Sequence, residues 1–179
     1  MQKVVVTGAT GFLGRSLVRK LLEENVYVIA VCRNLDLINM PKSDMLRYVI
    51  CNLEQITSLQ DLIPDEDIDT FYHVSWNGVS GIERVDISVQ LKNVFWTVDC
   101  LRAAKMIGCQ RFIGVGSIAE YEAIMATYTQ GSRPGLNYIY GGAKFFAYNA
   151  AKTLAESIKI DLIWTELVNV YGIGENEKG

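Results

Sequence analysis

A tyrosine and a lysine four residues apart could act together in proton transfer. Tyr140 and Lys144 stand in the segment YGGAK, and side chains at this spacing lie on one face of a helix. A phenol with a pKa of about 10 is a poor base at neutral pH, but a nearby ammonium group favours its ionised form. The pair could therefore pass a proton to and from a substrate while a nicotinamide moves a hydride.

Two further polar residues stand where they could complete this chemistry. Ser117 follows the apolar run 111–116, which we expect to be a strand. Open α/β sheets bind ligands at the carboxyl ends of their strands, so its hydroxyl could hydrogen-bond the substrate oxygen that gains or loses a proton. Asn93 lies inside a long expected helix, where asparagine is unfavourable and invites an explanation. The ordinary explanation is an exposed asparagine.

The junction between the first expected strand and the first expected helix predicts a dinucleotide site. Residues 7–14 read TGATGFLG, which gives the glycine spacing GxxGxxG. Gly8 can permit a tight turn, Gly11 lets backbone N–H groups approach a pyrophosphate, and Gly14 lets the helix lie close to the strand. The free N–H groups and partial positive charge of the helix then face the anion. The candidate cofactor contacts are Gly8, Thr10, Gly11, Phe12, Leu13 and Gly14.

The end of the second expected strand bears on which nicotinamide cofactor is bound. A domain that prefers NAD tends to place an acidic residue about 20 residues past the last glycine, where it binds the ribose hydroxyls. This chain has Cys32 and Arg33 there. Arg33 could pair with a 2′-phosphate, which favours NADP over NAD. The alternative is a solvated Arg33, with Asp36 serving the ribose.

Strand-like and helix-like segments alternate along the whole chain. Runs of β-branched and apolar residues predict strands at residues 3–7, 26–31, 46–50, 70–74, 111–116 and 161–168. Helical spacing predicts helices at residues 11–24, 54–63, 83–107 and 137–158, with Gly108 as the C-cap of the third. The alternation implies parallel strands joined by right-handed crossovers, hence an α/β fold with a Rossmann-like, doubly wound parallel sheet.

Residues 120–135 show no clear periodicity, and we expect them to form an irregular loop. Loops of this length are usually functional or mobile. The candidate contacts of such a flap to sugar hydroxyls or phosphate are Thr127, Thr129, Ser132 and Arg133.

The composition excludes several other classes of protein. The 17 Lys and Arg residues against 20 Asp and Glu residues give a net charge of −3, so there is no basic excess to bind nucleic acid. No apolar run approaches the roughly 20 residues that span a bilayer. The N-terminus leads directly into a strand and a glycine loop without a secretory signal, which favours a cytoplasmic location. The four cysteines share no CxxC spacing, so we expect buried thiols and no metal site.

Six sequence segments, which occur in the same order along the chain, resemble the motifs of the extended short-chain dehydrogenase/reductase superfamily, and together they span almost the whole chain. Within it, the chain is similar to the NAD(P)-dependent epimerase/dehydratase family, which acts on nucleotide sugars. The blocks are TGATGFLG, FYHVSW, LKN, RFIGVGSIAEY, YIYGGAK and NVYGIGE. The resemblance implies that Ser117, Tyr140 and Lys144 form a catalytic triad, and that Tyr140 and Lys144 also contact the cofactor. It further implies that Asn93 supports the lysine through a water molecule.

The resemblance assigns other residues to the cofactor pocket, some of them with departures from the family pattern. Asn52 and Leu53 stand where the family has Asp-Leu beside the adenine, and an amide can still hydrogen-bond the base. His73, Val74 and Ser75 replace the usual H-x-A block. Val74 and Ser75 would line the pocket, while His73 would lie near the cofactor without carrying a proton.

The two residues after Ser117 narrow the choice of reaction. Related 4,6-dehydratases carry Asp-Glu there, and this chain has Ile118-Ala119, which argues against a dehydratase. The general signature favours C4 epimerisation through a keto intermediate, whereas the HVSW block and Arg33 favour NADPH-dependent reduction of a 4-keto sugar nucleotide. A protein of another class, a sensor or scaffold that binds the cofactor without chemistry, is the third alternative. Glu166 replaces a basic residue that the family often has, and the sequence offers no physical reason.

The resemblance also bears on domain organisation and assembly. We expect residues 1–172 to form the NAD(P)-binding domain with the catalytic residues and residues 173–179 to begin a substrate-binding region, so that a C-terminal substrate lobe is missing from this truncated chain. Related enzymes often pair two long helices across a two-fold axis, which predicts a homodimer through helices 83–107 and 137–158. The apolar residues of these helices include Val89, Phe95, Trp96, Phe145, Phe146 and Tyr148.

Overall fold

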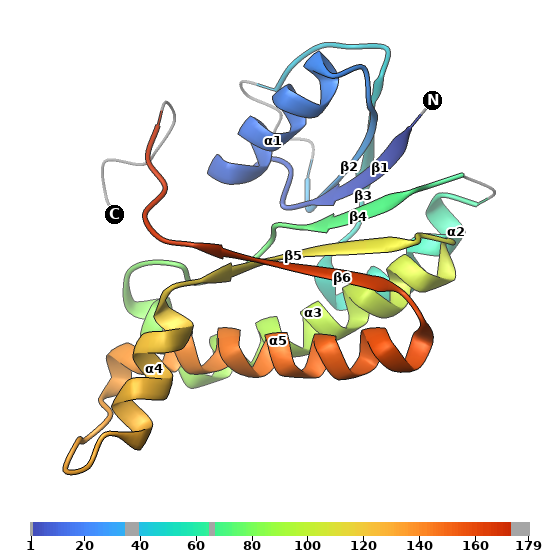
Figure 1. Ribbon diagram of the computed structural model, residues 1–179. Coiled ribbons are helices and arrows are strands. Elements are labelled where there is room, and N and C mark those ends of the chain that lie inside the picture. Colours follow the sequence, from blue (N-terminus) through green and yellow to red (C-terminus); the bar gives the residue numbers. More distant parts are fainter. Residues whose placement is uncertain (1, 35–39, 65–66, 173–179) are drawn as a thin grey trace.

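A six-stranded parallel sheet forms the centre of the computed structural model, which describes residues 2–34, 40–64 and 67–172 (Figure 1). The strands are β1 (Lys3–Thr7), β2 (Tyr27–Cys32), β3 (Leu46–Ile50), β4 (Thr70–His73), β5 (Arg111–Ser117) and β6 (Asp161–Leu167). Their order across the sheet is β3-β2-β1-β4-β5-β6, and each neighbouring pair is parallel. The order reverses between β1 and β4, which confirms the predicted Rossmann-like, doubly wound sheet.

Helices cover both faces of this sheet. α1 (Phe12–Glu23) lies on one face, while α2 (Leu59–Leu62), α3 (Ile87–Met106) and α5 (Ile139–Ile158) lie on the other (Figure 1). α3 and α5 pack side by side. Short 3₁₀ turns, η1 (Leu53–Ser58), η2 (Ile82–Val85) and η3 (Leu136–Tyr138), precede α2, α3 and α5. None of the helices in the described ranges combines the length and apolar character that crossing a membrane requires.

The core lies on both faces of the sheet because the central strands are apolar on both sides. Val4, Val5 and Val6 of β1 are all fully buried, as expected of a parallel strand that is covered on each face. On the side of α3 and α5, the rings of Phe71 and Phe112 stack with their centroids 5.5 Å apart. Burying side chains of this size stabilises the fold by about 1.5–3 kcal/mol each. The packed core on both faces of the sheet therefore holds the carboxyl ends of β1, β4 and β5 in place.

A helix occupies the first part of the stretch that we expected to be an irregular loop. α4 (Ala119–Tyr128) follows β5 and projects from the body of the molecule (Figure 1). The expectation over 120–135 is therefore wrong for this part, and only residues 129–135 lack regular structure. The segment AEYEAIMA is rich in residues of high helix propensity, and Glu120 and Glu122 lie in the first turn, where the helix dipole favours a carboxylate.

The start of α3 also differs from the predicted helix 83–107. The helix begins at Ile87, because the side chain of Asp86 accepts hydrogen bonds from the backbone N–H groups of Ser88 at 2.8 Å and Val89 at 3.0 Å. This is an N-cap, which ends the preceding turn and starts the helix. The C-cap of α3 is Ile107, one residue before the predicted Gly108, and Gly108 follows it with a φ of 84°, the left-handed conformation that glycine adopts at the end of a helix.

Candidate active site

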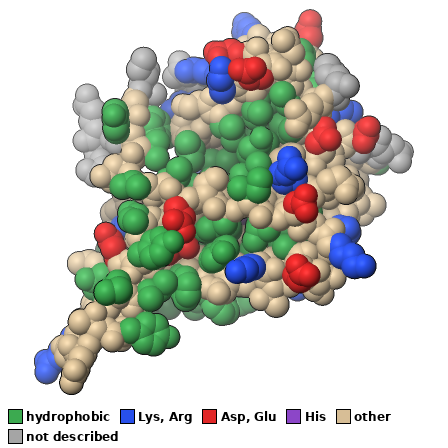
Figure 2. Space-filling view, viewed as in Figure 1, with side chains coloured by type: hydrophobic (Ala, Val, Ile, Leu, Met, Phe, Trp, Pro, Cys, Tyr) green, Lys and Arg blue, Asp and Glu red, His purple; other side chains and the backbone are tan. Residues whose placement is uncertain are grey.

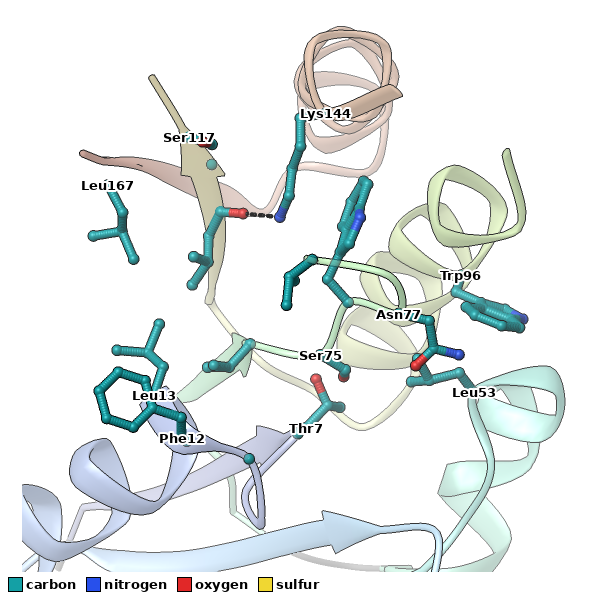
Figure 3. Close-up of a pocket in the computed structure, with 18 of the residues that line it drawn as sticks. Thr7, Phe12, Leu13, Leu53, Ser75, Asn77, Trp96, Ser117, Lys144 and Leu167 are labelled. Carbon is teal, nitrogen blue, oxygen red and sulfur yellow. Dashed lines mark hydrogen bonds between the residues drawn. The ribbon is translucent and has the colours of Figure 1, made fainter. Parts of the chain in front are cut away.

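A cavity of about 970 Å³ opens at the carboxyl ends of the strands (Figure 3). It lies beside the point where the strand order reverses, which is where open α/β sheets bind ligands. The predicted site residues that line it are Gly8, Thr10, Gly11, Phe12, Leu13, Gly14, Arg33, Asn52, Leu53, Val74, Ser75, Ser117, Tyr140 and Lys144. Residues that are far apart in the sequence thus meet at one cavity.

Glu122 lines this cavity, but the four candidate contacts of the expected flap do not. None of Thr127, Thr129, Ser132 and Arg133 is among the residues that line it. The reason is α4, which carries this part of the chain away from the carboxyl ends of the strands (Figure 1). The hydroxyl of Thr127 donates instead to the carbonyl oxygen of Ala123 within the helix, at 2.8 Å.

The glycine loop brings the amino end of α1 to the cavity without side chains in the way. Gly8 has a φ of 70°, which glycine adopts without cost, and a Cβ there would lie 2.8 Å from the backbone nitrogen of Ser75. A Cβ at Gly14 would collide with the carbonyl oxygen of Gly8. Gly11 is the N-cap of α1, and no side chain of the described residues caps the helix there, so the N–H groups of the first turn remain available to an anion.

The ends of β2 and β3 form the far wall of the cavity. Arg33, Asn52 and Leu53 line it, and Arg33 is exposed at the end of β2. Asp36, the alternative partner of a ribose, lies outside the described residues. On the β4 side, the Oγ atom of Ser75 is buried and has no hydrogen-bond partner among the described residues. Buried hydroxyls are nearly always paired, so a ligand in the cavity is its natural partner.

Lys144 is buried at the centre of the site and is 3% exposed. Its Nζ atom donates to the carbonyl oxygen of Val115 at 2.6 Å and lies 3.7 Å from the ring centroid of Trp76. Figure 3 shows the side chain reaching from α5 to this carbonyl group. Burial lowers the pKa of Lys144 to about 7, and the Glu120 carboxylate opposes this fall. The lysine is therefore close to its titration midpoint at neutral pH.

Tyr140 lies one turn earlier on the same face of α5 and is 7% exposed. Burial raises the pKa of its phenol, while the Ser117 hydroxyl and the Arg84 guanidinium oppose the rise. The Cζ atom of Arg84 lies 4.0 Å from the centroid of the tyrosine ring. Ser117 ends β5, and its Oγ atom accepts a hydrogen bond from the backbone N–H of Ala119 at 3.3 Å. The two hydroxyl groups and the lysine thus share one wall of the cavity.

Asn93 is buried in α3 and does not line the cavity. Its amide group pairs with the backbone of Asn77, with Nδ2 donating to the carbonyl oxygen and Oδ1 accepting from the N–H, both at 2.8 Å. Nδ2 also donates to the carbonyl oxygen of Val89 at 3.1 Å. The ordinary explanation, an exposed asparagine, is therefore wrong. Asn93 is buried, and its hydrogen bonds hold the loop after β4 against α3. Its water-mediated support of Lys144 stays a prediction.

His73 is buried between two threonine hydroxyls. Its Nδ1 lies 3.1 Å from Oγ1 of Thr7, and its Nε2 lies 3.1 Å from Oγ1 of Thr97. The Thr97 hydroxyl donates to the carbonyl oxygen of Asn93 at 2.9 Å, so it accepts from Nε2–H of the imidazole. Burial and the charge of Lys144 lower the pKa of His73 to about 3. The histidine therefore stays neutral and joins β1, β4 and α3.

Glu120 is a buried carboxyl group that the sequence analysis did not single out. Its Oε1 atom accepts hydrogen bonds from the backbone N–H of Ser117 at 2.8 Å and from the indole N–H of Trp164 at 3.1 Å. Burial raises its pKa, and these two hydrogen bonds oppose the rise. The side chain ties α4 to β5 and β6 directly behind Ser117. Its place three residues after Ser117 is the only signal for it in the sequence.

Glu166 and Trp76, two residues of the blocks described above, each make a hydrogen bond to another element. The hydroxyl of Tyr121 donates to Oε1 of Glu166 at 2.8 Å, which links α4 to β6 and gives a reason for the acidic residue at this position. The indole N–H of Trp76, in the HVSW block, donates to Oε1 of the buried Gln90 at 2.8 Å. Trp76 and Arg84 line the cavity, although neither was predicted as a site residue.

Comparison with known proteins gives a family match over almost the whole chain. The model of the family described as NAD dependent epimerase/dehydratase matches residues 4–179. A curated relative, dTDP-6-deoxy-L-talose 4-dehydrogenase (NAD(P)(+)) of Kitasatospora kifunensis, is 29% identical over 97% of this chain and 54% of its own length.

Solved structures share the fold of this chain. UDP-N-acetylglucosamine 4-epimerase from Bacillus cereus superposes with a TM-score of 0.72 at 18% identity, over 98% of this chain and 56% of its own. UDP-glucuronic acid 4-epimerase from the same organism, in complex with NAD, superposes with a TM-score of 0.70 at 19% identity, over 96% of this chain and 58% of its own. The chain thus spans about half the length of the relatives that it matches.

Proposed function

The chain belongs to the NAD-dependent epimerase/dehydratase family. On that basis we propose that the protein transfers a hydride to or from a sugar carbon of a nucleotide sugar. The main support for this proposal is that two groups of residues line the same cavity. The glycine loop and the free amino end of α1 form one side of it, and Ser117, Tyr140 and Lys144 form another. The first group suits a pyrophosphate and the second suits proton transfer at an oxygen atom.

The cavity fits a nicotinamide dinucleotide on grounds of its own chemistry. Gly8 and Gly14 leave out the two Cβ atoms that would collide with the backbone of the turn and of Ser75. The buried hydroxyl of Ser75, which has no hydrogen-bond partner among the described residues, belongs to a residue that lines the same space. Asn52 and Leu53 would hold the adenine, and Arg33 would pair with a 2′-phosphate, so we propose NADP ahead of NAD. A bound nicotinamide would supply the acceptor or donor of the hydride.

The residues of the chain would handle the proton that accompanies the hydride. The Ser117 hydroxyl would hold the oxygen on the reacting carbon, and the Tyr140 phenol would take the proton from that oxygen or return it. Lys144, as a cation, favours the ionised phenol. Because Tyr140 is buried and its phenol interacts with the Ser117 hydroxyl, both groups would orient the substrate oxygen before the proton moves.

Two reactions are compatible with this machinery. Epimerisation at C4 through a keto intermediate is our first proposal, because the general family signature favours it. Oxidation or reduction at C4 with exchange of the cofactor is the second candidate. It is supported by the curated 4-dehydrogenase relative, which is 29% identical to this chain.

Addition of cofactor and sugar nucleotide to the protein distinguishes these reactions. Oxidation of NADPH by a 4-keto sugar nucleotide supports the reductase, and interconversion of two sugar epimers with retained NAD supports the epimerase. Tyr140→Phe should abolish either activity while the cofactor still binds, because it removes the titrating hydroxyl and keeps the ring. Full activity of this variant would contradict the proton transfer. Cofactor binding without either activity would favour a sensor or scaffold.

We also propose a homodimer through α3 and α5. Exposed apolar side chains on these helices include Ile87, Leu91, Phe95, Phe145 and Phe146. The other predicted contacts, Val89, Trp96 and Tyr148, are half-buried, and Tyr148 packs against Trp164 with ring centroids 5.6 Å apart. Further hydrophobic side chains gather over α4 (Figure 2), where Tyr121, Met125 and Tyr128 are exposed.

A further inference from the structure

Arg84 lies against the ring of Tyr140 in the wall of the cavity. Its Cζ atom is 4.0 Å from the ring centroid, and its Nη1 atom donates to the carbonyl oxygen of Val79 at 2.7 Å. The residue belongs to η2 and lines the cavity. A guanidinium group this close to an aromatic ring is attracted to it, and the attraction grows when the ring carries negative charge.

Buried amides fix the segment that carries Arg84. Gln90 of α3 is fully buried, and its Nε2 atom donates to the carbonyl oxygens of Gly78 and Glu83, both at 2.9 Å. Asn93, one turn further along α3, pairs with both backbone groups of Asn77. The loop between β4 and η2 is therefore held to α3 at several points. The backbone beside Arg84 is therefore fixed, and the hydrogen bond from Nη1 to the Val79 carbonyl group positions the guanidinium itself.

Lys144 is less well placed to influence the phenol. Its Nζ atom is 5.9 Å from the Tyr140 ring centroid but only 3.7 Å from that of Trp76, and it donates to the carbonyl oxygen of Val115. Burial also lowers the pKa of this lysine to about 7, so part of the population is uncharged at neutral pH. An arginine guanidinium keeps its charge throughout the neutral range. Arg84 thus places a cation closer to the centroid of the Tyr140 ring than Lys144 does.

We propose that Arg84 is a positioning residue for Tyr140, which holds the ring in the cavity wall and favours the ionised phenol. The proposal rests on the proposed function, in which Tyr140 transfers the proton. Three groups act on this phenol, each from a different element: Arg84 from η2, Ser117 from β5 and Glu120 from α4. Lys144, on the same helix as Tyr140, lies 5.9 Å from the ring centroid. The Glu120 carboxylate disfavours the phenolate, and Arg84 offsets it from another element.

Titration of the phenol itself tests this proposal without any turnover. A fluorinated tyrosine at position 140 makes the phenol more acidic, and fluorine NMR then follows a single resonance with pH in the folded protein. Arg84→Gln keeps an N–H donor for the Val79 carbonyl group but removes the charge, and Arg84→Lys keeps a charge. We expect the midpoint to rise by about one pH unit in Arg84→Gln, a tenfold loss of phenolate, and to return partly in Arg84→Lys.

Unchanged midpoints in both variants, or equal rises in both, would overturn the role of the charge. Circular dichroism shows whether each variant is folded, and Arg84→Met, which keeps the aliphatic stem, replaces Arg84→Gln if that variant does not fold. If the midpoint shifts as expected but the protein transfers no hydride, then the proposed function fails and the assignment of Arg84 stands.

Discussion

At the scale of single residues, the site is built around side chains whose ordinary ionisation is suppressed by burial. His73 is the clearest case, because both ring nitrogens are occupied by threonine hydroxyls and its pKa is lowered to about 3. A second proton on the ring would remove the acceptor that the Thr7 hydroxyl uses. The folded state therefore resists protonation of this imidazole over a range in which the unfolded chain takes up a proton freely.

The resulting pH dependence of stability can be measured. Between the unfolded pKa of about 6.5 and the folded pKa of about 3, the unfolded state binds more protons, so stability is fully present above pH 6.5 and falls as the pH is lowered. The contribution of His73 to this slope approaches about 1.4 kcal/mol per pH unit. Urea unfolding of the chain and of His73→Gln at several pH values isolates it from the carboxylates. Equal slopes for the two proteins would contradict the assignment.

Some residues that line the cavity could be predicted from their type and spacing, whereas others reach the site only through the packing of separate elements. Ser117, Tyr140 and Lys144 carry recognisable groups at recognisable spacings, so they could be named from the sequence. Arg84 and Glu120 act only because η2 and α4 bring them beside Tyr140 and Ser117. The sequence around Arg84 gives no sign of this approach, and Glu120 has only its place three residues after Ser117, since both contacts depend on how separate elements pack.

At the scale of elements, the contact between α4 and α5 sets the geometry of the site. Gly141 follows Tyr140, and a Cβ there would collide with the carbonyl oxygen of Ala119 at the start of α4. A Cβ at the next residue, Gly142, would have no described atom within 4 Å outside its own helix backbone. Two adjacent glycines in one helix thus have opposite structural requirements.

Gly141→Ala and Gly142→Ala form a matched pair that tests this contact. We expect Gly141→Ala to reduce the free energy of unfolding by about 1–3 kcal/mol, because the helices must move apart. Gly142→Ala should stabilise the chain by up to about 1 kcal/mol, because alanine favours the helix. Thermal unfolding of the two variants measures both effects. Similar melting temperatures would show that α4 and α5 are not in close contact.

The elements themselves were largely predictable because their patterns are local. All six strands carry apolar runs, and each lies within a residue or two of its predicted bounds. α4 could not be predicted from periodicity, because its apolar residues do not gather on one face and a polar cluster that begins at Thr127 follows the helix-forming residues. The exact start of α3 depends on the cap at Asp86, which a long helical pattern conceals.

At the scale of the whole molecule, α3 and α5 leave exposed phenylalanines on an outer surface. Phe95 is 68% exposed and Phe146 is 60% exposed. If the proposed dimer forms through these helices, Phe95→Lys with Phe146→Lys should dissociate it, because the charges would be buried against each other. Tyr128→Lys, a change at an exposed residue of α4, is the matched control. Light scattering reads out the mass, and a chain that is already monomeric would refute the dimer.

Binding of a nicotinamide dinucleotide by this chain tests the central claim most directly. Titration calorimetry with NADP and with NAD, on the chain and on Tyr140→Phe, needs neither a sugar nor turnover. We expect one site per chain, tighter binding of NADP because of Arg33, nearly equal affinity in Tyr140→Phe, and a melting temperature that rises with the cofactor concentration. A folded chain that binds neither dinucleotide would contradict the account.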